Sequence, residues 1–380
     1  VVALGQHVGA DHDAAFDFAA ETFGAGVAVH FFKVAELGGA VAVAHAVEAR
    51  QVRRGFRRGD DVVGRQGVGR VRQADLDDLG AQLAPRELGG VGLREDLQPV
   101  RSYKLRGAFN FIAGLSDEER AAGVLAFSTG NHGQAVAASA RMTGATATIV
   151  MPQDAPQIKV DGCRWWGAEV VFYDPATQDR EVVGRELVEQ RGLTLVHPYD
   201  DPRVMSGQGT VGLEIVDQLR EGGHAPDAVI VPCSGGGLSS GVITAVRETH
   251  PGAAPFVVER DGYPKMARSL ASGRVEKVPA VPVFLDAIGS PTVGEHTLAA
   301  LSQHGVTGLE VTETLARLRG AGVRTFAADG SGERTVDEVD RSGPHAWVMG
   351  NEAWGLEPEV REQCDDVVRV PIYGHAESLN

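Results

Sequence analysis

The sequence predicts an α/β fold with a parallel sheet over the middle of the chain. Short apolar runs alternate there with stretches whose apolar residues recur every three or four positions. Strands joined by helices in this way form parallel βαβ units with right-handed crossovers. The two loops richest in glycine and polar residues, 128–133 and 234–237, each follow a predicted strand. Because ligands on such sheets bind where the strands end, these loops are the candidate site.

The predicted elements follow one another from residue 101. The segment RSYKLRGAFNFIAGLSDEER predicts a helix, because apolar residues recur at helical spacing from Leu105 to Leu115. A second helix is expected to begin in STGNHGQAVAASARMTG. The strands that we expect are GVLAF, ATIVMP, AEVVFY, LTLVHP and AVIVPC. The further helices that we expect are Gln157–Gly167, Asp179–Gln190, Gly209–Arg220 and Val242–Glu248.

Composition narrows the classes of function. The length of 380 residues suits about two domains, and the net charge of −15 argues against holding nucleic acid by bulk charge. Cys163, Cys233 and Cys364 form neither a disulfide framework nor a metal-binding spacing, which fits a reducing cytosol. No apolar run approaches the ~18 residues that span a bilayer, and the first residues lack a signal-peptide pattern. We therefore expect a cytoplasmic protein without membrane partners.

The first part of the chain, residues 1–90, has an unusual composition. The first 101 residues contain no Ser, Ile, Asn, Tyr, Trp, Cys or Met. Such a restricted set of residue types arises when GC-rich DNA is translated in the wrong frame or from the wrong strand, and we favour this interpretation. The alternative is a simple domain rich in alanine and valine.

The loop Ser234–Gly237 has the composition of a phosphate cradle. Its three glycines let the backbone approach an anion closely and point N–H groups at it, and the following helix adds the positive end of its dipole. No Gly-Lys-Ser/Thr follows, so the loop is not a P-loop, and the GxGxxG dinucleotide spacing is also missing. A tight turn in a crowded sheet is the structural alternative.

Two further motifs carry candidate chemistry. Lys104, in SYKLRGA, is either a surface charge or an amine desolvated in a cleft, with a pKa low enough to form a Schiff base. The loop STGNHGQ offers hydroxyls, an amide and a helix start, which suit a carboxylate and a ring oxygen; a capped helix start is the alternative. For His132 we favour an orienting or packing role over that of a base.

The order SYKLRGA, STGNHGQ and SGGGL resembles the pyridoxal-phosphate enzymes of fold type II, above all threonine dehydratase and serine racemase. The flanking segments LREDLQPV, SGQGTVGLEI and PFVVERDGYPKMARSLASGRVEKVP agree with this resemblance, which covers residues 91–306. It implies a parallel-sheet core, pyridoxal 5'-phosphate as cofactor and a place in amino-acid metabolism such as isoleucine biosynthesis. The implied reaction is β-elimination from threonine or serine, which gives a 2-oxo acid and ammonia. A homo-oligomer is also implied if the ends of the chain permit its interface.

The resemblance assigns a role to each matching residue. Lys104 would carry the cofactor and act as the base at the α-proton, and Asn131 would hydrogen-bond the 3-oxygen of the ring. The phosphate would be held by Ser234, Gly235, Gly236, Gly237 and Leu238. The substrate carboxylate would be bound by Ser128, Thr129, Asn131 and His132. Racemisation would need a second acid, for which Thr129 is the candidate.

The chain departs from this family at three places. Its first 90 residues replace the usual opening element, and we find no loop that would meet the pyridine nitrogen. In some members a magnesium-like site begins at a glutamate that Glu259 would match, but Lys265 stands where the second carboxylate is expected. We therefore predict no metal there, and we predict weakened cofactor binding and slow turnover.

The segment 309–380 resembles a different family. TETLARLRGAGVRTFAADGSG predicts a helix, a turn and a strand. HAWVMGNEAWGLEPEV and VVRVPIYGHAESLN are similar to motifs of the SpoU (TrmH-like) RNA 2'-O-methyltransferases, whose knotted fold binds S-adenosylmethionine. Ordinary α/β packing is the alternative interpretation. The residues that the resemblance implies for that site are Gly350, Asn351, Glu352, Gly355, Leu356, Ile372, Ser378, Leu379 and Asn380.

Two absences argue against methyl transfer. The motif with the catalytic arginine is not recognisable, and the segment holds only part of an α/β knot. We therefore expect exposed apolar strand faces, above all at Ala346, Trp347, Val348 and Met349. The chain is predicted to be a composite of 1–90, 91–306 and 309–380. Its first predicted function is the lyase; an inactive composite and an RNA methyltransferase are the alternatives, and RNA is a partner only in the last.

Overall fold

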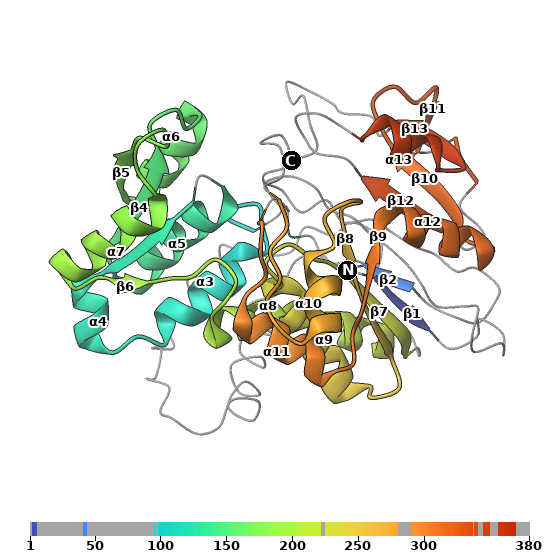
Figure 1. The fold of residues 1–380 in the computed structure, drawn as a ribbon, viewed down its shortest axis with the longest axis horizontal. Coiled ribbons are helices and arrows are strands. Elements are labelled where there is room, and N and C mark those ends of the chain that lie inside the picture. Colours follow the sequence, from blue (N-terminus) through green and yellow to red (C-terminus); the bar gives the residue numbers. More distant parts are fainter. Residues whose placement is uncertain are drawn as a thin grey trace. The chain divides into compact units, whose positions relative to one another are not determined.

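The fold was examined in a computed structural model, shown in Figure 1. It describes residues 2–5, 41–43, 95, 98–128, 130–221, 225–279, 290–336, 338–340, 345–349 and 356–369. The chain divides into two compact units. The described residues from Leu97 to Thr210 form the unit that we call the Lys104 unit. The glycine-loop unit comprises Val1–Ala46, Leu88–Asp96 and Val211–Asn380. Each unit is described by itself.

The Lys104 unit contains a four-stranded parallel sheet in the order β5-β4-β3-β6. The strands are β3 (Val124–Phe127), β4 (Ala147–Pro152), β5 (Glu169–Tyr173) and β6 (Thr194–Leu195). The helices are α3 (Lys104–Ala113), α4 (Asp117–Ala122), α5 (Asn131–Thr143), α6 (Gln157–Trp165), α7 (Arg180–Arg191) and the first part of α8 (Pro202–Glu221). The predicted alternation of strands and helices is therefore confirmed here.

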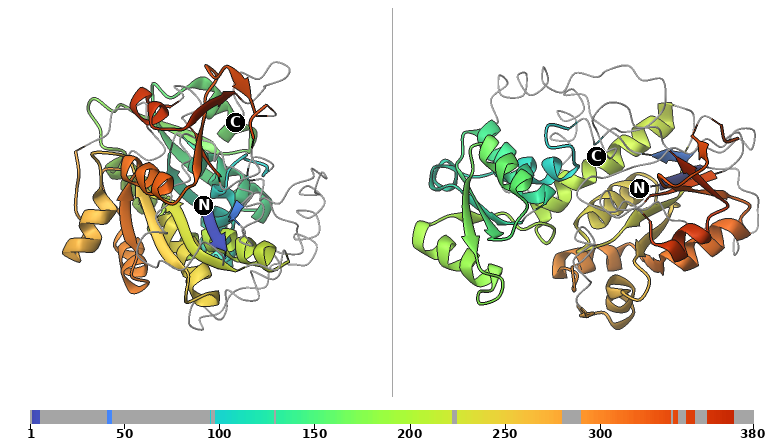
Figure 2. Two further views of the ribbon diagram at one scale, coloured as in Figure 1. Left: turned by 90° about the vertical axis from the view of Figure 1, so that its right-hand side faces the viewer. Right: turned by 90° about the horizontal axis from the view of Figure 1, so that it is seen from above.

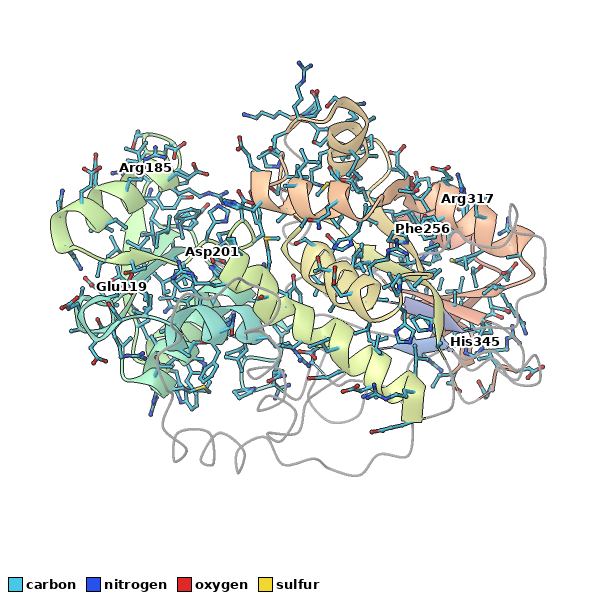
Figure 3. The ribbon with its side chains drawn as sticks, turned by 90° about the horizontal axis from the view of Figure 1, so that it is seen from below. Glu119, Arg185, Asp201, Phe256, Arg317 and His345 are labelled. Carbon is cyan, nitrogen blue, oxygen red and sulfur yellow. The ribbon has the colours of Figure 1, made fainter. Side chains whose placement is uncertain are left out.

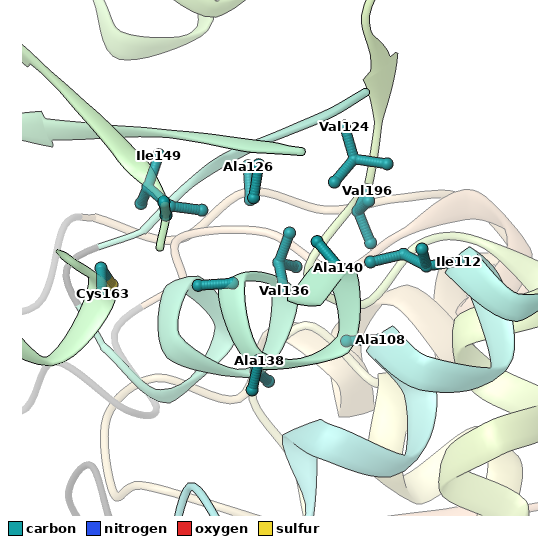
Figure 4. Close-up of a cluster of buried hydrophobic side chains, with 14 of the residues drawn as sticks. Ala108, Ile112, Val124, Ala126, Val136, Ala138, Ala140, Ile149, Cys163 and Val196 are labelled. Atoms are coloured by element: carbon teal, nitrogen blue, oxygen red, sulfur yellow. The ribbon is translucent and has the colours of Figure 1, made fainter. Parts of the chain in front are cut away.

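The two faces of this sheet bury alternate residues of the same strands. Ala126 of β3 and Ile149 of β4 pack with α3, α5 and α6, as Figure 4 shows. Phe127 and Val150, their chain neighbours, pack on the opposite face against α7. Because side chains along a strand point alternately to the two faces, a sheet covered on both sides needs continuous apolar strands. This is why VLAF and TIVM contain almost no polar residue.

Three helix starts differ from the sequence prediction. The single helix expected over 101–120 is two helices, because Ser116 caps α4. The Oγ of Ser116 accepts the N–H of Glu119, and the Glu119 carboxylate accepts the N–H of Ser116. Helix α8 begins at Pro202 rather than Gly209, since Asp201 caps its first turn. Helix α9 begins inside the glycine loop, at Gly237, rather than at Val242.

The glycine-loop unit is built on the sheet β2-β1-β7-β8-β9 (Figures 1 and 2). The strands β7 (Pro226–Pro232), β8 (Ala254–Glu259) and β9 (Thr307–Glu310) are parallel. The strand β1 (Val2–Gly5) runs antiparallel to β7 and to β2 (Val41–Val43). Its helices are α9 (Gly237–Thr249), α10 (Lys265–Ser272), α11 (Glu295–Gln303), α12 (Val311–Gly320) and α13 (Pro358–Glu362).

The segment that resembles the methyltransferases forms a second parallel sheet in the same unit, in the order β11-β13-β10-β12. Its strands are β10 (Arg324–Ala328), β11 (Arg334–Thr335), β12 (His345–Met349) and β13 (Asp366–Arg369). Its apolar residues share a core with one face of the first sheet, to which Phe256 of β8 belongs (Figure 3). The two sheets of this unit therefore fold as one body.

The expectation of an exposed apolar patch on β12 is wrong. Ala346, Trp347 and Val348 are buried. Ala346 and Val348 lie in the core shared with the first sheet, while Trp347 packs against Phe326 on the other face of β12. An incomplete segment can bury its strands if a neighbouring sheet offers an apolar face, and β7 and β8 offer one here. The side chain of Met349 lies outside the described set.

Candidate active site

The amine of Lys104 lies at the start of helix α3. Its Nζ donates a hydrogen bond to the carbonyl oxygen of Pro198 over 2.7 Å. Burial of the amine lowers its pKa from 10.5 to about 8. Desolvation disfavours the ammonium form, and a neutral carbonyl partner does not offset this as a carboxylate would. A sizeable fraction of this amine is therefore unprotonated near neutral pH, which a nucleophilic lysine requires.

The turn before Lys104 positions it. Arg101 has a φ of 53°, in the left-handed region, and its N–H donates to the carbonyl oxygen of Gln98 at 2.7 Å. Ser102 is fully buried, and its Oγ accepts the N–H of Lys104 at 3.2 Å. A non-glycine residue in this region is strained and persists only where its surroundings hold it, and such strain collects at functional sites.

His132 is buried on α5 as a neutral ring. Its Nε2 lies 2.8 Å from the carbonyl oxygen of Val196, and its Nδ1 has no partner among the described residues. Burial and the charge of Lys104 lower the pKa of His132 to about 3. A ring with so low a pKa is a weak base, which agrees with an orienting or packing role.

His197 was not among the predicted site residues. Its Nδ1 accepts the N–H groups of Tyr199 and Asp200, at 3.3 and 2.8 Å, and its ring meets Phe127 edge-on. Burial lowers its pKa, and the charge of Lys104 contributes to the same direction. The signal was available, because His197 lies at the carboxyl end of the predicted strand LTLVHP, and chemistry collects at the carboxyl ends of parallel strands.

The loop between β3 and α5 forms a compact turn. The Oγ of Ser128 accepts the N–H of Gly130 at 3.1 Å, and Asn131 is the half-buried first residue of α5. A Cβ on Gly133 would lie 2.7 Å from the carbonyl oxygen of Ser128, so only glycine fits there. Thr129 lies outside the described residues. Lys104, Ser128, Asn131 and His132 thus belong to one unit, as the sequence analysis required.

The glycine loop turns sharply between β7 and α9. Gly236 has a φ of 98°, and a Cβ there would lie 2.7 Å from Thr297. The hydroxyl of Thr297 donates to the carbonyl oxygen of Gly235 at 2.8 Å. No acceptor among the described residues takes the N–H groups of Gly235, Gly236 or Gly237. Unpaired N–H groups at a helix start form an anion site, so the loop has the chemistry that a phosphate requires.

The two ends of this loop are also placed. Ser234 is half-buried, and Leu238 packs against the core beneath α9. These residues belong to the glycine-loop unit, whereas Lys104 belongs to the other unit. Of the residues implied for S-adenosylmethionine, the structure describes Leu356, which is buried in the shared core. The others, Gly350, Asn351, Glu352, Gly355, Ile372, Ser378, Leu379 and Asn380, lie outside the described residues.

Three other sequence expectations concern metals, cysteines and membranes. Lys265 pairs with Glu259, its Nζ lying 3.2 Å from Oε1. The described residues contain no group of three His, Cys, Asp or Glu side chains that would hold a metal ion. Cys163, Cys233 and Cys364, all among the described residues, form no disulfide with one another. Within the described ranges, every helix is too short or too polar to cross a bilayer.

Comparison with known proteins yields two family matches. Residues 81–318 match the family described as pyridoxal-phosphate dependent enzyme, and residues 261–380 match the SpoU rRNA Methylase family. These matches confirm both resemblances and support a composite chain. Among curated relatives, the L-threo-3-hydroxyaspartate ammonia-lyase of Saccharomyces cerevisiae is 39% identical over 228 residues, which are 60% of this chain and 67% of the relative. The L-threonine ammonia-lyase of Thermotoga maritima is 40% identical over 55% of this chain and 51% of its own.

Solved structures of enzymes named as threonine deaminase and serine racemase also resemble this chain. Threonine deaminase isoform 2 from Solanum lycopersicum is 32% identical, with a TM-score of 0.55 over 77% of this chain and 82% of its own. The serine racemase from Dictyostelium discoideum is 26% identical, with a TM-score of 0.54 over 86% of this chain and 98% of its own. The chain spans about half the length of the Thermotoga relative. Since the match to the first family covers more than half of the chain, the chain belongs to the pyridoxal-phosphate dependent enzymes.

Proposed function

We propose that this chain is an ammonia-lyase that converts a small hydroxy amino acid, such as threonine or serine, into a 2-oxo acid and ammonia. The observation that carries the proposal is the Lys104 amine, whose pKa is lowered to about 8 beside the Pro198 carbonyl. An amine of this kind suits both attachment to an aldehyde cofactor and proton abstraction next to a carboxylate. The relatives named as threonine and hydroxyaspartate ammonia-lyases support the substrate class.

The residues present fit the cofactor of the family. Unpaired N–H groups of Gly235, Gly236 and Gly237 suit its phosphate, and the Lys104 amine suits its aldehyde. When bound, pyridoxal phosphate supplies an electron sink for charge that develops on the substrate α-carbon. The amine of Lys104 would take the α-proton, and Asn131 would hydrogen-bond the 3-oxygen of the ring. The β-hydroxyl would leave as water with the proton that Lys104 has taken, and one water molecule would then hydrolyse the dehydrated product to the 2-oxo acid and ammonia.

The remaining loop residues bind the substrate in this proposal. The hydroxyls of Ser128 and Thr129, together with the N–H groups at the start of α5, hold its carboxylate. His132 stays uncharged, because its pKa is about 3, and it supports the loop through Val196. A neutral ring beside Lys104 also avoids a second positive charge, which would disfavour the protonation of Lys104 that the reaction needs.

The test is the visible absorbance of the purified chain with added pyridoxal phosphate, followed by assays with threonine and serine. The cofactor joined to Lys104 is expected to give an absorbance band that Lys104→Ala removes, while Lys277→Ala, at an exposed lysine, retains it. The absence of the band from the unmodified chain would contradict the proposal. We also expect a homo-oligomer in the cytoplasm, and light scattering would measure its mass.

The match to the SpoU rRNA Methylase family supports a second candidate, S-adenosylmethionine-dependent methylation of an RNA ribose. Titration calorimetry with S-adenosylmethionine tests it directly. Saturable binding would establish the methyl-donor site, and a flat titration would leave the lyase as the sole candidate. The pyridoxal-phosphate match covers the larger part of the chain, so the lyase ranks first.

A further inference from the structure

We propose that Lys265 is a positioning residue whose buried ammonium group, paired with Glu259, holds the glycine loop in its anion-binding shape. The inference deepens the proposed function, since it concerns the loop that would hold the cofactor phosphate. All the residues that carry it belong to the glycine-loop unit.

The pair Glu259–Lys265 differs from the other ion pairs of the described residues. Their exposed side-chain fractions are 0% and 2%, whereas every other described pair has at least one side chain that is more than a tenth exposed. Taking two charges out of water is costly unless further hydrogen bonds satisfy them. An ion pair that is buried in this way therefore needs further hydrogen-bond partners, and both residues have them.

The additional partner of Lys265 lies at the entrance to the loop. Its Nζ donates to the carbonyl oxygen of Cys233 over 3.4 Å, and the N–H of Cys233 donates to Val258 at 2.8 Å. Cys233 directly precedes Ser234, so this carbonyl and the Ser234 N–H share one peptide plane. In a trans peptide the two bonds point in opposite directions. A carbonyl drawn towards the ammonium therefore turns the N–H of Ser234 away from it.

The additional partners of Glu259 are the first N–H groups of α10. Oε1 accepts the N–H of Met266 and Oε2 accepts that of Ala267, both at 2.9 Å. The side chain of Met266 would lie 3.0 Å from a Cβ on Gly236, so the start of α10 packs directly against the loop. The carboxylate thus anchors Lys265 and also fixes the surface on which the loop rests.

This arrangement has a consequence for anion affinity. The loop presents unpaired N–H groups to the anion. If the loop were free to change shape, binding would have to order these groups first, and the free energy of ordering would weaken the affinity for phosphate. The Lys265–Cys233 hydrogen bond is long, at 3.4 Å, but its donor carries a charge, so it resists such change. We expect its removal to weaken binding of pyridoxal phosphate about tenfold, the effect of one charged hydrogen bond.

The experiment uses the full chain and a variant that removes both charges, Glu259→Gln with Lys265→Met, so that no unpaired charge is left in the core. The exposed lysine variant Lys277→Met is the matched control. Equilibrium dialysis measures the binding of pyridoxal phosphate and of inorganic phosphate, and thermal unfolding verifies the fold. Hydrogen exchange of the amides of residues 234–238 is measured without any ligand. Glu259→Gln with Lys265→Gln replaces this double variant if the latter does not fold, since it also leaves no unpaired charge.

The expected result is about tenfold weaker binding of both probes and faster exchange in 234–238, with the Lys277 variant unchanged. Binding within twofold of the unmodified chain, together with unchanged exchange, would overturn the inference and leave the pair a part of the core alone. If the unmodified chain binds neither probe, the proposed function fails. The exchange comparison still decides the role of Lys265 in that case, because it needs no ligand.

Discussion

The two units use a lysine in different ways, half-buried in one and buried in the other. In the Lys104 unit the amine faces the neutral carbonyl of Pro198, and its pKa falls to about 8. In the glycine-loop unit the ammonium of Lys265 faces the carboxylate of Glu259 as well as a carbonyl. Only the second lysine faces an opposite charge. The partner of each lysine therefore fits its proposed role, reactive amine for Lys104 and positioning residue for Lys265.

The largest expected effect is on chemistry. Lys104→Ala is expected to lower lyase turnover by about a thousandfold or more, because it removes both the attachment point and the base. Steady-state assays with threonine measure the loss, and Lys159→Ala provides the control. Turnover within tenfold of the unmodified chain would show that another amine does the work.

The second prediction compares how much the removal of each lysine lowers the free energy of unfolding. Lys265→Met leaves Glu259 buried without a counter-charge and is expected to lower the free energy of unfolding by about 3–5 kcal/mol. Lys104→Met leaves the Pro198 carbonyl unpaired but also relieves the desolvation of the amine, so a loss of about 1 kcal/mol or less is expected. Urea unfolding followed by circular dichroism measures both. Equal losses would refute the distinction between the two partners.

The third prediction concerns the pH at which the Lys104 amine becomes reactive towards a chemical label. At pH 8 about half of the Lys104 amine is unprotonated, against well under 1% of an ordinary lysine, which makes its reactive fraction roughly a hundredfold larger. The cofactor-free chain is labelled with an amine-specific reagent between pH 6 and 11, and mass spectrometry follows each lysine. Labelling of Lys104 should rise with a midpoint near pH 8. A midpoint near 10.5 would remove the basis of the proposed role.

The same shift predicts the sign of a stability change. The pKa of Lys104 is lower in the folded chain, so between about pH 8 and 10.5 the unfolded chain binds more protons at this residue. The contribution of Lys104 to stability therefore rises with pH across this window and is constant above it. Comparing unfolding of the unmodified chain with that of Lys104→Met at pH 8 and 10 isolates this contribution. A difference that shrinks with pH would contradict the sign.

The last prediction concerns the backbone of the glycine loop. Gly236→Ala is expected to lower the free energy of unfolding by about 1–3 kcal/mol, because φ is 98° and the new Cβ would meet Thr297. Gly252→Ala is the matched control, since no heavy atom lies within 4 Å of a Cβ there. Thermal unfolding compares the two. A Gly236 variant as stable as its control would show that the loop tolerates another shape.

Much of the fold and site could be predicted from local pattern. Short continuous apolar runs placed β3, β4 and β7, and the motif around Lys104 placed the candidate reactive amine. Helix starts were less accurate, because the caps at Ser116 and Asp201 depend on side chains that the apolar pattern does not weigh. His197 was missed for a related reason: it follows a strand of only two residues.

The sequence by itself determined the order of strands and helices, the glycine loop at the end of β7 and the two families that parts of the chain match. These properties follow from short-range periodicity and from residue types at fixed spacing. Only the tertiary structure decided that Pro198, 94 residues away, receives the Lys104 amine, and that a neighbouring sheet covers Ala346 and Val348. Both depend on packing between distant segments, which local pattern does not encode. The role of Lys265 likewise follows from its burial and its partners.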